Sequence, residues 1–150
     1  PIEKQFITYD MNEVKEYWAT DATALKAFAA GNDMRNRDKD YSTVGENAVY
    51  INVWAYEPGW TVTVTENGTP LDVKQVWSKK DPLHSISYDI PRGAANNGTL
   101  TFPSTSCMHM FEVTASSASS TLEISVTDRF GNVSTESMIR PKALTTDVTK

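Results

Sequence analysis

From Ala48 to Met138 the apolar residues recur mainly at every second position, and short turn signals separate the alternating runs. A period of two places successive side chains on opposite faces of a strand, so the pattern predicts a series of short strands. The predicted elements are a strand over residues 48–54, a hairpin over 60–77, a strand over 81–91, another over 106–116, and a hairpin over 120–138. Short strands in series, separated by turns, are typical of a sandwich of two antiparallel sheets.

Two turns define the predicted hairpins. Asn67-Gly68 follows an alternating run of Thr and Val, and this pair readily adopts the positive φ angles of a type I′ turn. Gly131 stands where the second hairpin must reverse. We therefore predict a mainly β fold, an immunoglobulin- or fibronectin-like antiparallel β-sandwich with one or two short N-terminal α-helices.

The N-terminal part has helical periodicity instead. Asp10 and Glu13 have the spacing of a capping box, and apolar residues follow at helical intervals, so we predict a helix over about residues 11–18. A second helix is predicted from residues 20–21 to Gly31, since glycine readily adopts the left-handed conformation that ends a helix.

A length of 150 residues predicts a single domain, 1–150, because a chain of this size can bury a core of its own. Within it, residues 1–46 are predicted to form a helical lead-in with a charged loop, and residues 47–150 the β-sandwich. The sequence begins at Pro1, which leaves open whether it is a mature product, an excised domain or a trimmed fragment.

Charge and hydropathy argue against nucleic acid as a partner and against a membrane span. A net charge of −5 disfavours nucleic acid, because phosphate binding needs clustered Lys and Arg. No apolar run approaches the roughly 20 residues that span a bilayer, and no leader opens the chain, so we expect no membrane span. The single cysteine allows no internal disulfide.

That cysteine, Cys107, lies two residues from a histidine in the stretch SCMHMFEV. An extended chain places Cys107, His109 and Phe111 on one inward face, which favours a buried thiol and a buried histidine with structural roles. A zinc site needs four ligands, and Cys107, His109 and His84 supply three. We therefore predict no catalytic, cofactor-binding or metal-binding residue in this chain, and keep a Cys107–His109 enzyme as an alternative.

Aromatic residues suggest a different kind of site. Tyr50, Trp54, Trp60 and Trp77 are the candidates for a flat platform on which sugar rings could stack. Rings of this kind more often fill the space between sheets, which is the reading we favour. A glycan or cell-envelope binding module is the alternative function.

Four segments together resemble one known family. These are TYDMNEVKEYW, WTVTVTENGTPLDVKQV, DPLHSISYDIPR and HMFEVTASSASSTLEISVTDRFGNVSTESMIRPK, of which VTDRFGNV leading to MIRPK is the most specific. They are similar to the C-terminal accessory domain of bacterial calcineurin-like phosphoesterases, which follows the metallophosphatase domain in secreted proteins. The metal-binding motifs of the catalytic domain, such as D-x-H and G-N-H-[DE], are missing from this chain.

The resemblance implies a non-catalytic domain whose partner is the preceding catalytic domain of the same polypeptide. That absent domain would hold two metal ions and hydrolyse a phosphoester, and the protein would be periplasmic or extracellular. We expect docking through the N-terminal helix, with Tyr17 and Trp18 as candidate contacts, and the same exposed patch would let an isolated chain form a homodimer.

Overall fold

The structure is a computed structural model that describes residues 4–23, 27, 41–77, 79–95 and 107–146. In this part of the chain, two four-stranded antiparallel sheets face each other. Sheet A has the order β1 (Phe6–Asp10), β2 (Ala48–Val53), β6 (Met110–Thr114), β5 (Lys74–Gln75). Sheet B has the order β4 (Thr69–Pro70), β3 (Thr61–Glu66), β7 (Leu122–Thr127), β8 (Val133–Met138). The predicted mainly β sandwich is confirmed, and its immunoglobulin or fibronectin type stays a prediction.

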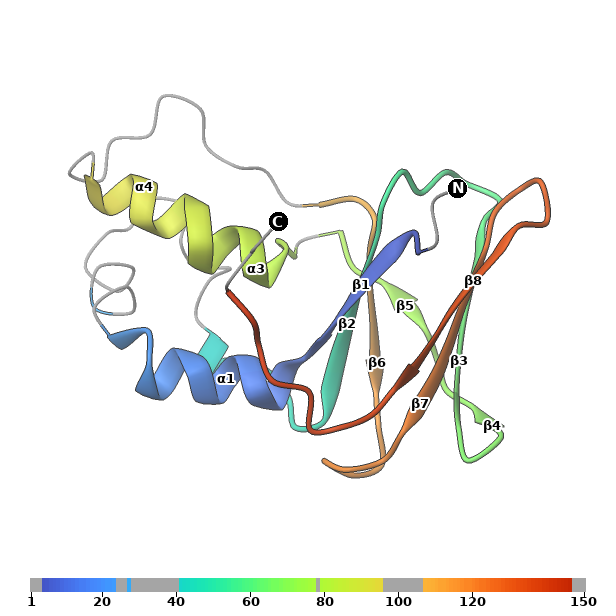
Figure 1. The fold of residues 1–150 in the computed structure, drawn as a ribbon, viewed down its shortest axis with the longest axis horizontal. Helices are drawn as coiled ribbons and strands as arrows, with labels where there is room; N and C mark the ends of the chain where they lie inside the picture. The colour runs from blue at the N-terminus through green and yellow to red at the C-terminus, as the bar shows by residue number, and fades with distance from the viewer. Residues whose placement is uncertain (1–3, 24–26, 28–40, 78, 96–106, 147–150) are drawn as a thin grey trace.

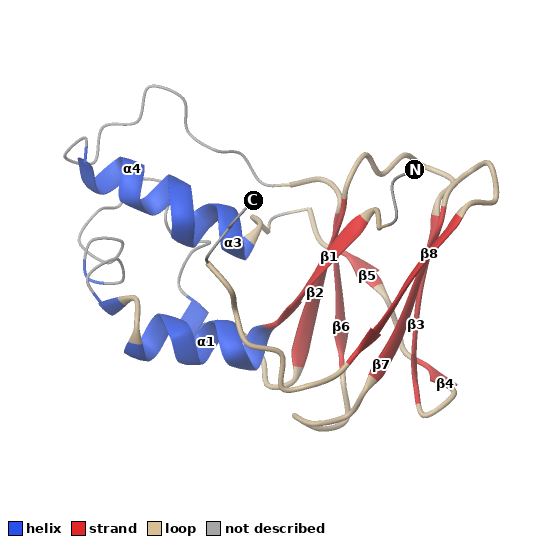
Figure 2. Ribbon diagram, viewed as in Figure 1, coloured by secondary structure: helices blue, strands red, loops and turns tan. Residues whose placement is uncertain are grey.

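The helices form a third layer on the outer face of sheet A, as Figures 1 and 2 show. They comprise α1 (Met11–Thr20), a 3₁₀ turn η2 (Tyr41–Thr43), α3 (Pro82–His84), a π-helical segment η3 (Ser85–Asp89) and α4 (Ile90–Ala95). In the described ranges, no helix has the length and apolar character needed to cross a bilayer.

The main core lies between the two sheets. Alternate residues of β2, among them Val49 and Ile51, pack there against Val64, Ile124 and other inward-facing residues of sheet B. The remaining residues of β2, such as Tyr50, face the helical layer in a second core. Every residue of β2 is therefore buried, as expected for a strand covered on both faces.

Helix α1 begins as predicted. Asp10 has an extended backbone, and its side chain accepts a hydrogen bond from the backbone N–H of Asn12 at 3.2 Å, the arrangement of an N-cap. The residues just before it form β1, which pairs with β2 and was not predicted. The predicted lead-in of residues 1–46 thus contains a strand of sheet A. The predicted second helix ending at Gly31 lies mostly outside the described residues.

The strand predicted over residues 81–91 is wrong, since the segment is helical from Pro82 to Ala95. Asp81 caps it, accepting the backbone N–H of His84 at 2.9 Å, and Pro82 occupies the first turn, where its missing N–H costs nothing. Its buried residues recur at helical spacing and turn one face toward sheet A: Pro82, Ser85, Ile86, Asp89 and Ile90.

Both predicted turns are confirmed. Asn67 and Gly68 have φ angles of 49° and 78°, and Gly131 has a φ of 87°. The second strand of the first hairpin is only two residues long, Thr69–Pro70. The chain then crosses to sheet A, where Lys74–Gln75 pairs with β6.

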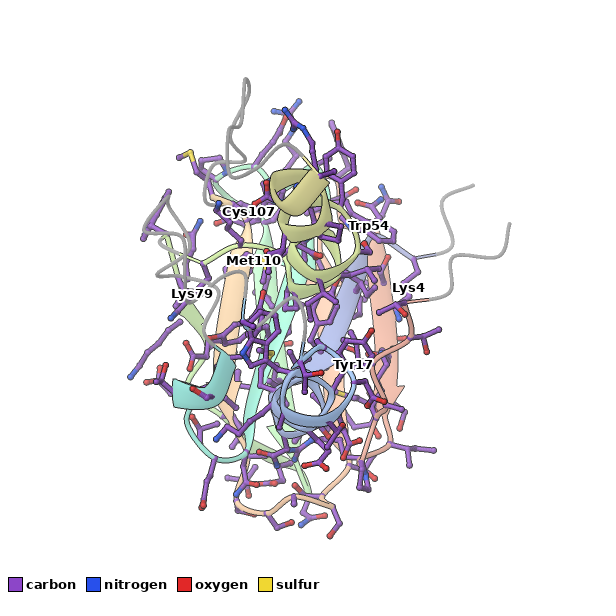
Figure 3. The ribbon with its side chains drawn as sticks, turned by 90° about the vertical axis from the view of Figure 1, so that its left-hand side faces the viewer. Lys4, Tyr17, Trp54, Lys79, Cys107 and Met110 are labelled. Atoms are coloured by element: carbon purple, nitrogen blue, oxygen red, sulfur yellow. The ribbon has the colours of Figure 1, made fainter. Side chains whose placement is uncertain are left out.

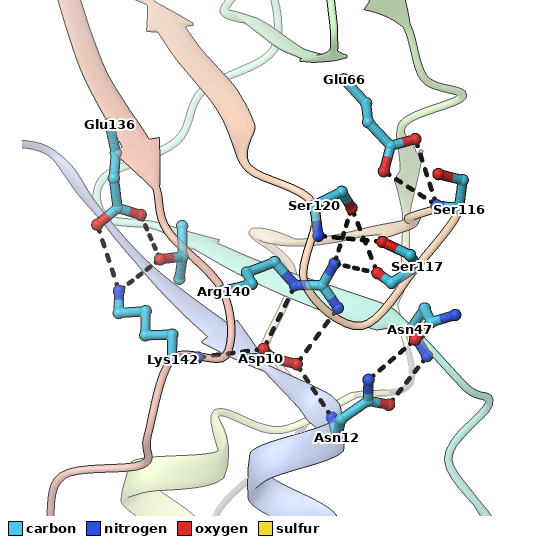
Figure 4. A network of polar contacts seen from close by, with 11 residues as sticks. Asp10, Asn12, Asn47, Glu66, Ser116, Ser117, Ser120, Glu136, Arg140 and Lys142 are labelled. Atoms are coloured by element: carbon cyan, nitrogen blue, oxygen red, sulfur yellow. Dashed lines mark hydrogen bonds and ion pairs between the residues drawn. The ribbon is translucent and has the colours of Figure 1, made fainter.

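A polar network links the end of β8 to β1 (Figure 4). The carboxylate of Glu136 accepts hydrogen bonds from Lys4 at 2.6 Å, from Lys142 at 3.2 Å and from the Thr8 hydroxyl. Lys142 also donates its backbone N–H to Asp10 at 3.2 Å. The segment after β8 is therefore fastened to the first strand of the other sheet.

Candidate functional site

A cleft of about 480 Å³ opens beside the outer face of sheet A, where the helical segment begins. Its walls include Ile7, Leu83 and Trp54, and its polar lining includes Tyr9, Asn52, Lys80, Asp81, His84, Ser87 and Cys107. A volume of this order lies within the range of small-molecule sites, roughly 300–1,000 Å³. Figure 3 shows Trp54 and Cys107 on the face of the molecule that carries the helices.

Asp81 organises the polar side of this cleft. One carboxylate oxygen, Oδ2, accepts the hydroxyl of Tyr9 at 2.6 Å and the side-chain amide of Asn52 at 2.8 Å. The other oxygen caps the helix that begins at Pro82. The carboxylate is thus held rigidly at the point where β1, β2 and the helical layer meet.

The network continues from Asn52 to the histidine and the cysteine. Because the Nδ2 of Asn52 donates to Asp81, its Oδ1 faces the Nδ1 of His109, at 3.0 Å. That nitrogen therefore carries the proton and donates to Asn52. It is also the ring nitrogen nearest the Sγ of Cys107, at 3.0 Å.

Cys107 and His109 are in contact, and His109 is also engaged with Asn52. With Nδ1 as the donor to Asn52, the ring nitrogen that remains an acceptor is Nε2, which lies 3.5 Å from Sγ. Burial raises the pKa of the Cys107 thiol, a backbone hydrogen bond with His109 lowers it in part, and the charge of Asp81 raises it slightly further. The raised pKa favours the un-ionised form of this thiol at neutral pH.

Tyr9 has the most strongly shifted pKa in the cleft. Burial raises the pKa of its hydroxyl, and the adjacent charge of Asp81 and the hydrogen bond to it raise it further. Tyr9 is therefore a fixed donor to Asp81 at any physiological pH.

The predicted common face of Cys107, His109 and Phe111 is wrong. Phe111 points into the core between the sheets, whereas Cys107 packs with the helical layer and His109 contacts Asn52. The reason is that β6 begins only at Met110, and the turn before it breaks the alternation. His84, the third predicted donor, has its ring beside Tyr88, with the ring centroids 5.3 Å apart. In the described part of the chain, no group of three or more His, Cys, Asp and Glu could hold a metal ion.

The four aromatic candidates do not form one platform. Tyr50 is buried against the helical layer, and Trp60 is half-buried against the core between the sheets. Trp54 and Trp77 are exposed, and of these Trp54 lines the cleft. The favoured interpretation as core filling therefore describes Tyr50 and Trp60, and the binding hypothesis is left with Trp54 and Trp77.

The two docking candidates on α1 face inward. Trp18 is 1% exposed and packs edge-to-face on Tyr41, with ring centroids 5.4 Å apart. Tyr17 is partly buried against the same core. Trp18 offers no surface to a partner, because it fills the space between α1 and sheet A.

Sequence reasoning missed Tyr9, Asn52 and Asp81. The available signal was Asp81-Pro82, a capping residue followed by a proline suited to a first helical turn. This signal would have predicted that the carboxylate of Asp81 lies at the start of a helix. The partnership with Tyr9 and Asn52 depends on sheet pairing that short-range patterns do not encode.

Comparison with known proteins identifies a family. A family model described as the C-terminal of calcineurin-like phosphoesterase matches residues 1–133. Searches of curated proteins and of solved structures found no match.

Proposed function

Since the chain belongs to the family of C-terminal domains of calcineurin-like phosphoesterases, we propose that it is a non-catalytic accessory domain that docks on or positions the catalytic domain of a secreted metallophosphoesterase. The family match, which covers most of the chain, carries this proposal. The architecture supports it, because a sandwich with a helical layer offers surfaces for a neighbouring domain.

The polar cluster of the cleft supports a non-catalytic role. Its thiol has a raised pKa, and the nearest imidazole nitrogen is engaged with Asn52. In this proposal two metal ions belong to the catalytic domain, where they would activate a water and stabilise the phosphoryl group. The residues described here position that domain and take no part in hydrolysis.

The first experiment compares the isolated chain with the longer native polypeptide. An antibody raised to the domain should detect a band far above 16.7 kDa in the source cells. That band should co-purify with metal-dependent hydrolysis of a phosphomonoester or phosphodiester, while the isolated chain hydrolyses neither. A native band at the mass of the isolated chain would sink the proposal.

We also propose a periplasmic or extracellular location, which rests on the family resemblance. Fractionation of the source cells with the same antibody tests it. Recovery in the cytosolic fraction would contradict this location and leave the accessory function untouched.

A second candidate function is glycan binding at the cleft, and Trp54 is the observation that favours it. A sugar ring stacks its apolar face on an indole and offers hydroxyls to a carboxylate, and Trp54 and Asp81 line the same cleft. Titration calorimetry with cell-envelope oligosaccharides should give binding that Trp54→Ala abolishes. Trp77→Ala is the matched control, since Trp77 is exposed but does not line the cleft. Equal binding by both variants, or none by the native chain, would exclude the cleft as a glycan site.

A further inference from the structure

Most of the exposed large hydrophobic residues lie toward one end of the sandwich. Among the described residues, the large hydrophobic side chains that are strongly exposed are Trp54, Trp77, Tyr88, Met108, Phe130, Val133 and Ile139. Tyr88 lies in the helical layer and Ile139 follows the far end of β8. The other five belong to the end at which β1 begins, and we call them the apolar rim: Trp54, Trp77, Met108, Phe130 and Val133.

Strand register brings the sheet A members of the rim together. Phe6, the first residue of β1, pairs with Val53, the last residue of β2, so Trp54 follows at this end. The backbone N–H of Val53 donates to the carbonyl of His109 at 3.0 Å, which puts Met108 beside it. Val76 donates to Met110 at 2.9 Å, so Trp77 comes next along the same edge.

Sheet B contributes the other two residues of the apolar rim, Phe130 and Val133. The connection from β2 to β3 brings Thr61 to this end, and Thr61 pairs with Thr127, so the β7–β8 turn with Phe130 lies here too. Arg129 in that turn forms an ion pair with Glu57 of the β2–β3 connection at 3.3 Å. Val133 pairs with Thr127 at the base of the turn.

The chain also reaches the sandwich at this end. The carbonyl of Gln5 accepts the backbone N–H of Trp54 at 2.9 Å, immediately before β1 begins. A domain joined N-terminally to this chain therefore arrives beside Trp54. Large exposed apolar patches on soluble domains mark interaction sites, and a partner tethered there has a high effective concentration.

We propose that the apolar rim is the surface on which the catalytic domain docks, with Phe130 and Trp54 as its central contacts. This rests on the proposed accessory function and replaces the docking site predicted on α1. The partner surface is a complementary apolar patch on the catalytic domain, next to its own C-terminal end. Aromatic side chains at a domain boundary supply large contact areas at low cost in conformational entropy.

Photo-cross-linking in the full polypeptide, with its catalytic domain, tests the surface directly. A photoreactive phenylalanine is placed at position 130 in one variant and at position 139 in the other. These positions form a matched pair, because Phe130 is 75% exposed and Ile139 is 74% exposed at opposite ends of β8. A third variant carries the probe at Tyr88 of the helical layer.

Cross-links from position 130 to peptides of the catalytic domain, without such cross-links from 139 and 88, are the expected result. Cross-links from 139 or 88 in place of 130, or equally from all three, would overturn the rim while leaving the accessory function standing. Absence of inter-domain cross-links from every position would overturn docking itself. Phe130→Ser and Ile139→Ser provide a second readout: the former alone should increase proteolytic cleavage between the domains, and equal cleavage in both would contradict the proposal.

Discussion

Asp10 and Arg140 form an ion pair whose side chains are both fully buried, with the Nε of Arg140 3.3 Å from the Oδ2 of Asp10. The guanidinium also donates to the carbonyl of Ser117 at 2.7 Å, in the loop before β7. Asp10 is at the same time the N-cap of α1. One carboxylate thus joins the helical layer, sheet A and the segment after sheet B (Figure 4).

Breaking this pair should be costly. Arg140→Met leaves a buried carboxylate without its cation, and such a loss lowers the free energy of unfolding by about 3–5 kcal/mol. Denaturation with urea, followed by fluorescence, measures the change. Arg129→Met is the matched control: that arginine pairs with Glu57 on an exposed surface, where the expected loss is below about 1 kcal/mol. Similar losses of unfolding free energy in both variants would show that the buried Asp10–Arg140 pair stabilises the fold no more than the exposed pair does.

Glu136 should make stability depend on acid pH. Burial on its own raises the pKa of this carboxyl, but hydrogen bonds from Lys4 and Thr8 and the charge of Lys142 together hold it below its usual value. The resulting stabilisation is present above the unfolded pKa, about 4.3, and is lost as pH falls through the lower folded value. Urea midpoints between pH 6 and pH 3 should fall less steeply in Glu136→Gln than in the native chain. Glu16→Gln, on the exposed face of α1, should keep the native slope. Parallel slopes for Glu136→Gln and the native chain would contradict the assignment.

Cys107 should react slowly with alkylating agents. The thiolate is the reactive form, and the raised pKa of this thiol keeps it protonated at neutral pH. Mass spectrometry should show iodoacetamide modification slower than that of glutathione at pH 7, accelerating at more alkaline pH. In the full polypeptide, modification should leave phosphoesterase activity unchanged. Rapid alkylation at pH 7 accompanied by loss of activity would favour the Cys107–His109 enzyme.

Trp18 should behave as a core residue. Trp18→Ala removes a buried ring and is expected to lower the free energy of unfolding by about 3–5 kcal/mol. Trp18→Phe should cost less, because the indole Nε1 has no hydrogen-bond partner among the described residues. Thermal unfolding of the isolated chain measures both, with Tyr17→Ala as the neighbouring, less buried comparison. If Trp18→Ala left stability unchanged but weakened docking, the α1 surface would regain its predicted role.

The sequence predicted the elements whose signals are local. The capping residue Asp10, the turn residues Asn67 and Gly68, and the alternation of β2 each act within a few positions, and the structure has α1, the first hairpin and a strand where they indicate. The strand predicted over residues 81–91 was wrong because Ile86, Tyr88 and Ile90 recur at every second position, as they would in a strand. Ile86 and Ile90 are also four residues apart, which suits a helix. Their burial against sheet A and the cap provided by Asp81 stabilise the helical conformation.

The candidate site was less predictable than the fold. Cys107 and His109 are close in sequence, so their proximity could be anticipated. Asn52 lies 57 residues from His109, and Tyr9 lies 72 residues from Asp81. Those contacts follow from the pairing of β1, β2 and β6 and from the helical segment lying against them, which no short motif specifies.

The Asp10–Arg140 pair joins residues 130 positions apart, which has a consequence for biosynthesis. A ribosome delivers β1 and α1 before Arg140, so the cation that neutralises Asp10 is synthesised 130 residues after it. Until then the nascent chain lacks the contact that closes the helical layer over the sandwich. The helical layer of this domain is therefore expected to close only after Arg140 has been synthesised, and β1 waits on the nascent chain until then.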